Sequence, residues 1–351
     1  MIKGNPNTER AYRNVLLDSY SSLKDFADDK KKYYKRYVEG QKVEEEENKA
    51  MTMGSLVETL LWERDLFDKK FKMSECEKTS TGIMLNFVTA LVKCTIDSID
   101  PETNQVSKDF EELSREAHEL SGFKISYEAV IKKFAGSDDE IYFNELLEVT
   151  VNNLIVVGVK EVTNAERIVD ELKNNSVTSE IINRISSERW ETINQLQIER
   201  FEIDGYTLKG MLDYLEIDHL NKVVYPYDLK CTWAVERFFE DGYLYRRYYI
   251  QAYVYYTAVK HYIASREDLK GYRVEYMRFI VCDSINYFNP LIYCVTDELM
   301  DDAYWGFTHR GRKYVGVGEI IKGLKFAQEM NVWNISMENY LSKGVVELGY
   351  E

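Results

Sequence analysis

The sequence predicts an α/β protein with a central mixed β-sheet flanked by helices. Three strand-like runs lie between residues 195 and 230, and Asp204-Gly205 separates the first two with a strong hairpin signal. A long helical stretch and two further strand-like runs follow, an order typical of a sheet covered by helices. The runs are Gln195–Ile203, Thr207–Ile217, Lys222–Lys230, the helix Val235–Tyr262, Val274–Cys282 and Leu291–Val295.

Helical patterns precede and follow this region. Ser21 or Ser22 is suited to cap a helix whose continuation, Lys30–Tyr37, interleaves basic residues with tyrosines. This strip is either a DNA-facing surface or a helix face whose lysine stems cover core tyrosines. The other helices are expected at Met53–Lys69, Phe110–Leu120, Tyr127–Phe134, Ala165–Leu172, Asp297–Arg310 and Glu319–Met330.

The middle of the chain has a mostly helical pattern without motifs that carry chemistry. Within it, the apolar run Leu154–Val159 suits either a short strand or a buried helix. We therefore expect a helical insertion between two parts of one core. The three parts are the N-terminal helical part at 1–73, the insertion at 74–191, and the remaining core with the C-terminal helices at 192–351.

Composition excludes several classes of protein. With 45% hydrophobic and 30% charged residues, the chain is globular rather than disordered or fibrous. Its net charge of −15 argues against a protein that coats nucleic acid nonspecifically, but leaves open an enzyme that holds DNA in a locally basic groove. No apolar run approaches the roughly 18 residues of a membrane span, and no secretory signal is evident, so we expect a cytoplasmic protein.

Soft metal sites are not expected from the cysteine and histidine content. The five cysteines are dispersed, and there are only four histidines. These residues offer neither the spacing of a zinc site nor the four thiolates of an iron–sulfur cluster. Any bound metal is therefore expected to have oxygen ligands, which favours Mg²⁺, with Mn²⁺ as a substitute.

Two short motifs carry charged residues into strand-like runs. Gly210-Met211-Leu212-Asp213 precedes Tyr227-Asp228-Leu229-Lys230 on the neighbouring strand of a hairpin. Asp228 and Lys230 are two residues apart and point to the same face of a strand. Two carboxylates beside an ammonium suit a divalent ion that activates water, with the lysine stabilising charge on a phosphate. The alternative is a surface Asp–Lys pair, although the apolar surroundings make an unpaired charge expensive there.

The long helix adds a third motif. Gln251 and Tyr255 are four residues apart, and Arg247 lies four residues before them, so the three are expected to form one polar stripe that contacts a DNA phosphate. The alternative is the polar edge of an amphipathic helix whose many tyrosines belong to the core.

The order of these motifs resembles the PD-(D/E)XK nuclease superfamily, in particular the branch of the RecB nuclease domain, the RecE-like phage exonucleases and lambda exonuclease. The resemblance implies a restriction-endonuclease-like core and spans nearly the whole chain, except for the helical middle. It is carried by Ser19–Phe26 with Lys32–Tyr37, Gly54-Ser55-Leu56-Val57-Glu58, Gly210-x-x-Asp213, Asp228-x-Lys230 and Gln251-x-x-x-Tyr255.

The resemblance implies roles for these residues. Asp213 and Asp228 would be catalytic metal ligands together with the carbonyl of Leu229, and Lys230 the catalytic lysine. Gln251 and Tyr255, with Arg247, would help to bind DNA. Glu58 would be a further metal ligand, although it stands where the family usually has histidine. Glu199 resembles a frequent acidic position of the family and is either a supporting acid or an exposed strand charge.

The function implied is that of a Mg²⁺-dependent DNA nuclease, an exonuclease of DNA recombination, repair or phage DNA processing. No iron–sulfur cluster is expected, because Asp28-Asp29-Lys30 lacks the cysteine of cluster-bearing relatives. Implied partners are DNA, a single-strand annealing protein and further copies of the chain, in the host cytoplasm if a phage encodes it. The alternatives are an endonuclease of the same superfamily, a non-catalytic DNA-binding protein with a relic site, and a helical interaction protein.

Overall fold

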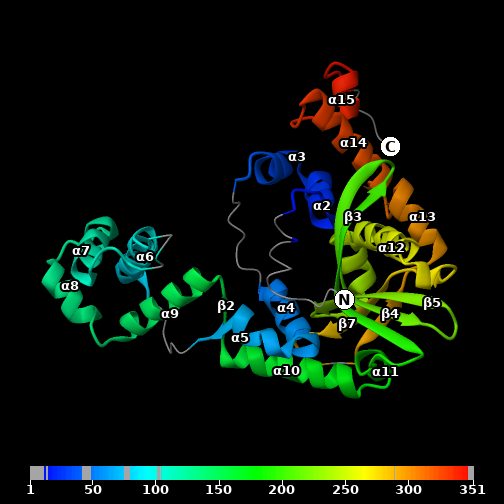
Figure 1. Ribbon diagram of the computed structural model, residues 1–351. Helices are drawn as coiled ribbons and strands as arrows, with labels where there is room; N and C mark the ends of the chain where they lie inside the picture. The colour runs from blue at the N-terminus through cyan, green and yellow to red at the C-terminus, as the bar shows by residue number, and fades with distance from the viewer. Residues whose placement is uncertain are drawn as a thin grey trace. The chain divides into compact units, whose positions relative to one another are not determined.

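The computed structural model describes residues 12, 15–41, 49–74, 80–100, 103, 105–287 and 289–346. The chain forms two compact units (Figure 1): Met1–Glu63 with Ala165–Glu351, and Arg64–Asn164. The interrupting unit is thus 64–164, whereas the sequence analysis placed the insertion at 74–191. Arg184 explains why the later residues lie in the first unit, since it forms an ion pair of 2.6 Å with Glu216 of the sheet.

The first unit is built on a mixed sheet in the strand order β3–β4–β5–β7–β8, with β6 beside β5. The meander β3–β4–β5 is antiparallel, as predicted, whereas β7 runs parallel to β5 and antiparallel to β8. The predicted fold class, a central mixed sheet flanked by helices, is confirmed. The strands are β3 (Trp190–Ile203), β4 (Tyr206–Asp218), β5 (Val223–Thr232), β6 (Arg273–Val274), β7 (Arg278–Asp283) and β8 (Leu291–Cys294).

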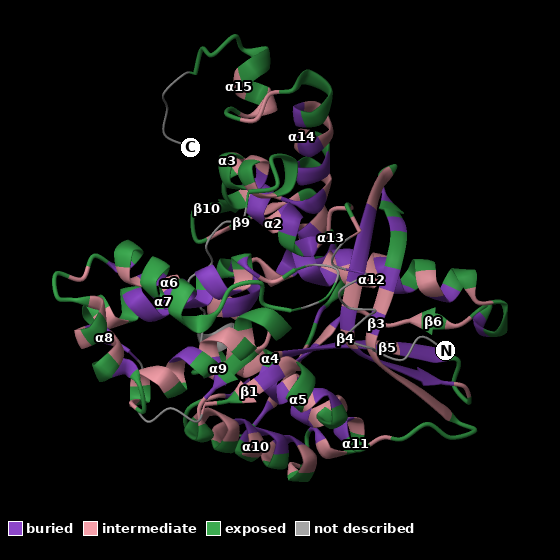
Figure 2. Ribbon diagram, turned by 60° about the vertical axis from the view of Figure 1, so that its left-hand side comes forward, coloured by how far each residue is buried: buried purple, intermediate pink, exposed green. Residues whose placement is uncertain are grey.

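Helices pack on this sheet and bury its core (Figure 2). Residues of α2, α12 and α14 form one hydrophobic cluster with β3, β4 and β7. The helices of the unit are α2 (Tyr20–Asp28), α3 (Lys30–Tyr33), η1 (Tyr34–Val38), α4 (Lys49–Trp62), most of α10 (Val159–Asn174), α11 (Ser179–Ile182), η3 (Val235–Arg237), η4 (Phe239–Tyr245), α12 (Tyr248–Ser265), η5 (Glu267–Leu269), α13 (Asp297–Trp305), α14 (Val317–Met330) and α15 (Met337–Leu341).

Two predicted helices are shorter than expected. The helix predicted at 235–262 is interrupted, and α12 begins only at Tyr248, because Arg247 has a left-handed backbone with φ 59°. The helix predicted to reach Arg310 ends at Trp305, because Gly306 has φ 84°. A small hairpin of β9 (Phe307–His309) and β10 (Arg312–Tyr314) follows.

The N-terminal helix begins slightly earlier than predicted, at Tyr20, and Ser19 is its N-cap. The basic and aromatic strip that follows is held in place mainly by Asp25. This carboxylate pairs with Lys32 at 2.9 Å and with Arg36 at 3.4 Å. Tyr33 is buried, which favours the interpretation that the strip covers core tyrosines, although some of its lysines remain exposed.

The second unit, 64–164, has a helical core of its own around Phe87 and Phe134. The predicted strand-or-helix run forms β2, which pairs in parallel with β1. Among the described residues, no helix combines the length and apolar character needed to cross a bilayer. The elements are η2 (Arg64–Leu66), α5 (Phe67–Lys70), β1 (Phe71–Met73), α6 (Gly82–Asp97), α7 (Phe110–Ser121), α8 (Tyr127–Phe134), α9 (Asp138–Asn152) and β2 (Ile155–Val157).

The cysteines include one close pair that spacing does not reveal. Cys231 of β5 lies directly opposite Cys282 of β7, and the two sulfur atoms are 3.3 Å apart as free thiols. Cys94 is buried and Cys294 is exposed, while Cys76 lies outside the described residues.

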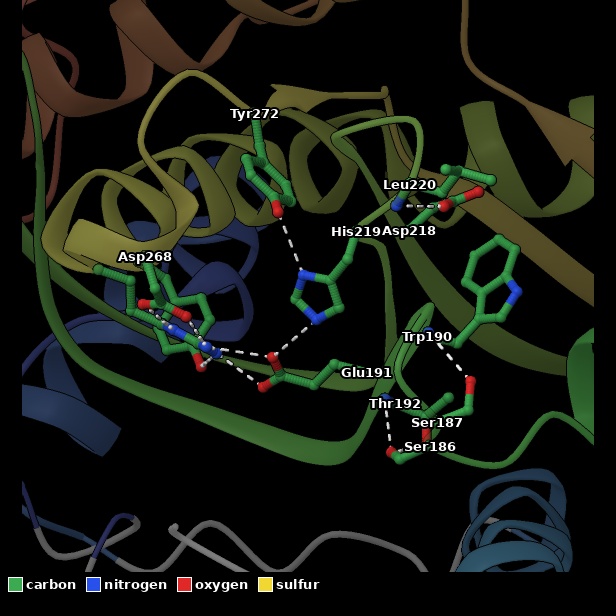
Figure 3. Close-up of polar contacts among 12 residues, drawn as sticks. Ser186, Ser187, Trp190, Glu191, Thr192, Asp218, His219, Leu220, Asp268 and Tyr272 are labelled. Carbon is green, nitrogen blue, oxygen red and sulfur yellow. Dashed lines mark hydrogen bonds and ion pairs between the residues drawn. The ribbon is translucent and has the colours of Figure 1, made fainter.

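The turn between β4 and β5 is organised by one buried carboxylate, Asp218 (Figure 3). Its Oδ1 accepts hydrogen bonds from the backbone N–H groups of Leu220 and Asn221, at 3.0 and 3.1 Å. Its Oδ2 accepts from Arg189 at 2.9 Å. The hydrogen bond from Arg189 and those from Asn221 outweigh the effect of burial and lower the pKa of Asp218 to about 2. These bonds hold the end of the hairpin and thereby its register.

Replacing Asp218 with asparagine is expected to reduce the free energy of unfolding by about 1–2 kcal/mol at pH 7, because the ion pair with Arg189 is replaced by hydrogen bonds from its guanidinium to a neutral amide. The difference between the two proteins should shrink as the pH falls from about 4 to about 2, since protonation of Asp218 removes the same interaction. Urea unfolding curves between pH 7 and pH 3 measure this. Asp268→Asn, at an exposed aspartate that also pairs with an arginine, is the control and should change stability little. A difference that is independent of pH would contradict the role of the charge.

Candidate active site

The register of the β4–β5 hairpin brings two aspartates together. Tyr214 pairs with Tyr227, so the preceding residue of β4, Asp213, lies opposite the following residue of β5, Asp228. Asp213 accepts a hydrogen bond of 2.8 Å from the backbone N–H of Leu229. At the point where the two strands separate, a side-chain carboxylate therefore replaces a backbone carbonyl as the hydrogen-bond acceptor.

Asp228 is almost completely enclosed, with 1% of its surface exposed. Its Oδ1 accepts a hydrogen bond of 2.8 Å from Nε2 of Gln251 on α12, and its Oδ2 forms an ion pair with Lys230. The Lys230 side chain is 18% exposed, and its ammonium lies 4.6 Å from the ring centroid of Tyr248. The strand thus presents a fixed carboxylate and, on the same face, a lysine whose side chain is partly exposed.

A third carboxylate comes from α4. The side chain of Gln195 donates a hydrogen bond of 3.4 Å to Glu58 Oε2. Gln195 has a left-handed backbone with φ 49°, which interrupts the pairing of β3 with β4. By the register of the two strands, Gln195 lies opposite Asp213. Glu58 is close enough to Asp213 to raise the pKa of that aspartate. The sheet and α4 therefore bring three acidic groups to one place.

The charges of this cluster do not balance. Burial raises the pKa of Asp213 well above its usual value, and the carboxylates of Asp228 and Glu58 raise it further. Burial also raises the pKa of Asp228, although Lys230 opposes the shift. For Lys230, burial acts to lower the pKa, but Asp228 outweighs it and the pKa is raised. The carboxylates of Asp213 and Asp228, with Lys230 as the cation beside them among the described residues, thus favour the uptake of a proton or of a cation.

The donor chemistry of the cluster fits a hard divalent cation. Its carboxylate oxygens are the ligands that Mg²⁺ and Mn²⁺ prefer. Gln251 Oε1 is buried and has no hydrogen-bond partner within the described part of the chain, so one polar atom at the cluster is still unsatisfied. In the same part of the chain, no three acidic, histidine or cysteine side chains, those of Glu58, Asp213 and Asp228 included, form a group that could hold a metal as they stand. That these three carboxylates hold a metal therefore stays a prediction. The predicted ligand role of the Leu229 carbonyl stays a prediction.

Gly210, the glycine of the first motif, permits close packing beneath the site. A Cβ atom at this position would lie 3.4 Å from the ring of Phe201, 3.5 Å from Ala258 and 3.9 Å from Tyr255. These are ordinary van der Waals distances, so α12 packs directly on β4 at Gly210. The same helix carries Gln251, which lies within hydrogen-bonding distance of Asp228.

The other predicted residues divide into those beside the cluster and those away from it. Tyr255 is beside it, because Asp228 and Asp213 both contribute to its raised pKa, after burial. Arg247 does not continue the stripe of Gln251, since it precedes α12 and pairs instead with Asp28 at 2.6 Å. Glu199 is exposed in the bulge of β3, which agrees with the alternative of an exposed strand charge.

Three residues of the site were not predicted from the sequence. Tyr248 contacts Lys230, and its spacing of three residues before Gln251 was an available signal. Tyr20 packs edge-on against Tyr255 with ring centroids 6.1 Å apart. Gln195 had no signal, because its unusual backbone is invisible in the sequence.

Comparisons with known proteins add little to this geometry. No family model matches the chain, and no curated protein matches its sequence. Among solved structures, it is similar to a Eubacterium rectale protein named as a putative exonuclease. The identity is 13% and the TM-score 0.48, over 100% of this chain and 96% of that one. The interpretation of the site therefore depends on its own residues.

Replacing Asp213 with asparagine is expected to stabilise the metal-free protein above about pH 4, where unfolded aspartate ionises. The raised pKa means that the native protein holds its proton more tightly than the unfolded chain, so wild-type stability falls as the pH rises. Asparagine carries no charge and can still accept the hydrogen bond from Leu229. The gap should widen by at most about 1.4 kcal/mol per pH unit. Urea unfolding in EDTA from pH 4 to pH 8 measures it, and a wild type as stable as the variant at pH 8 would contradict the explanation.

Proposed function

We propose that this protein is a divalent-metal-dependent nuclease that hydrolyses phosphodiester bonds in DNA. The observation that carries the proposal is the convergence of Asp213, Asp228 and Lys230, which lie on two adjacent strands around the buried carboxylate of Asp228. A metal-dependent nuclease needs oxygen ligands for its cation and a positive group near the phosphate. The cluster offers both in one place. That the substrate is DNA follows from the family resemblance of the motifs.

Each residue has a defined task in this mechanism. Glu58, Asp213 and Asp228 would hold Mg²⁺ or Mn²⁺, which when bound supplies Lewis acidity to the phosphate and lowers the pKa of a water molecule. Gln251 keeps the carboxylate of Asp228 in one orientation through its hydrogen bond.

Lys230 is the residue of this cluster that is suited to contact the reacting groups. Its ammonium pairs with Asp228 and lies over the ring of Tyr248, and its side chain as a whole is 18% exposed. It can donate a hydrogen bond to the attacking water or to a phosphate oxygen as negative charge develops there. Because its pKa is raised, it stays charged at neutral pH and acts as an electrostatic group, not as a base.

An exonuclease of DNA recombination, repair or phage DNA processing is the finer form of this proposal, supported by the resemblance of the motifs. An annealing partner and a homo-oligomer belong to it on the same ground. A non-catalytic relic is disfavoured by the energetics of the site. Buried like charges destabilise a fold, and a protein with no use for them would gain stability by losing one.

Lys230→Met and Asp228→Asn are each expected to lower magnesium-dependent DNA hydrolysis by at least about 100-fold, because each removes a charge at the reacting phosphate. Methionine keeps the hydrophobic stem against Tyr248, which protects the fold. Lys313→Ala, at an exposed lysine of β10, is the matched control and should keep full activity. End-labelled linear duplex and single-stranded DNA with Mg²⁺, or with EDTA, measure the rates. Circular dichroism verifies folding, and full activity in either site variant would remove the assignment.

The same assay separates an exonuclease from an endonuclease. An exonuclease releases nucleotides progressively from the ends of linear DNA and leaves covalently closed circles intact. Cleavage of closed circles at a comparable rate would favour the endonuclease alternative.

Mn²⁺ and Mg²⁺ are expected to raise the melting temperature of the wild type, because a bound cation offsets the repulsion among the three carboxylates. Asp213→Asn should lose most of this increase, since the variant lacks both a ligand and the repulsion. Thermal unfolding with increasing metal concentration measures the effect, and Asp268→Asn serves as the control. An equal increase in the wild type and Asp213→Asn would place the metal elsewhere.

A further inference from the structure

Residues 233–247, which connect β5 to α12, expose two large aromatic rings. We call this segment the connection. Trp233 is 53% exposed and Tyr245 is 68% exposed. Each ring is accompanied by an arginine: the guanidinium of Arg237 lies 5.4 Å from the ring centroid of Trp233, and that of Arg312 lies 5.8 Å from Tyr245. We call Trp233 and Tyr245 the aromatic pair.

Both rings are tied closely to the site by the chain itself. Trp233 follows Lys230 by three residues, and Tyr245 precedes Tyr248 by three. Three residues span at most about 11 Å between Cα atoms. Lys230 and Tyr248 are in contact. Trp233 is therefore close along the chain to one member of this contact, and Tyr245 is close to the other.

Folding does not explain why these two rings are exposed. The same connection places other aromatic residues in the core: Phe238 and Tyr243 are each 3% exposed. Phe238 packs against Tyr248 and Tyr293 at centroid distances of 5.8 and 5.0 Å. The connection therefore divides its aromatic residues between the core and the surface, and the surface ones are available to a ligand.

The charges of the connection indicate what kind of ligand it is. Residues 233–247 contain three arginines and three acidic residues, so the segment has no net charge. Arg237 is paired with Asp241 at 2.9 Å, and Glu240 is paired with Arg310 at 3.0 Å. Such a surface has little attraction for the regular phosphates of a duplex. Exposed rings beside arginines are instead suited to stack on unpaired bases.

We propose that Trp233 and Tyr245 form a stacking surface for the unpaired bases of a single-stranded DNA segment next to the scissile phosphate. The choice of DNA depends on the function proposed above, whereas the preference for single strands follows from the aromatic pair. The nuclease would then act on a single strand or on a frayed end of a duplex.

Binding is measured by fluorescence anisotropy in EDTA with labelled oligo-dT of about 20 nucleotides, and with a blunt hairpin duplex of the same length. Trp233→Ala and Tyr245→Ala should each weaken oligo-dT binding by about 5- to 150-fold, the effect of one lost base stack. Trp233→Phe keeps a ring and should recover most of the affinity. The duplex should bind more weakly than oligo-dT and change less than about twofold in either variant.

Trp305→Ala is the matched control, because Trp305 is 75% exposed on α13 of the same unit and lies outside the connection. It should bind oligo-dT as the wild type does. Equal affinity of Trp233→Ala, Tyr245→Ala and the wild type would overturn the proposal. So would an equal loss for duplex and oligo-dT, or a wild type that fails to bind oligo-dT below about 100 µM.

The two proposals can fail separately. A protein that binds oligo-dT through the aromatic pair but never cleaves DNA with Mg²⁺ keeps the stacking surface and loses the nuclease function. A protein that cleaves DNA while both alanine variants bind and cleave as the wild type does keeps the nuclease function and loses the stacking surface.

Discussion

The buried carboxylate of Asp228 is the constraint on which the site depends. An ionised group with 1% exposure is stable only if hydrogen bonds and an opposite charge replace the water that it has lost. Gln251 and Lys230 supply these partners, one from α12 and one from the same strand. The hydrogen bond from Gln251 to Asp228 therefore helps to fix the position of α12 over the sheet.

Features some distance away along the chain hold this arrangement together. The turn at Asp218 maintains the register that sets Asp213 opposite Asp228, five and ten residues away along the two strands. α12 packs directly on β4 at Gly210. Burial and the neighbouring carboxylates raise the pKa of Asp213, so keeping this group ionised costs the fold stability.

The stacking surface proposed for the connection between β5 and α12 would let an acidic protein contact nucleic acid through aromatic rings. Its net charge is zero, and its two exposed aromatic rings each lie near an arginine. Stacking does not require a high positive charge, because the attraction is to the faces of the bases. A net charge of −15 for the whole chain is therefore compatible with binding a single strand next to the candidate site.

The sequence by itself determined the elements whose signals are local. The predicted boundaries of α7 and α8 hold within one residue, because caps at Asp109 and Ser126 act over one helical turn. The meander was predictable from the Asp204-Gly205 turn, and with it the position of Asp213 and Asp228 on neighbouring strands. Tertiary structure alone decided what depends on contacts between distant residues: the left-handed backbones of Gln195 and Arg247, the pairing of Arg247 with Asp28, and the limits of the second unit at 64 and 164. Local sequence patterns reflect interactions between neighbouring residues. These features arise instead from packing between segments that are far apart in the sequence.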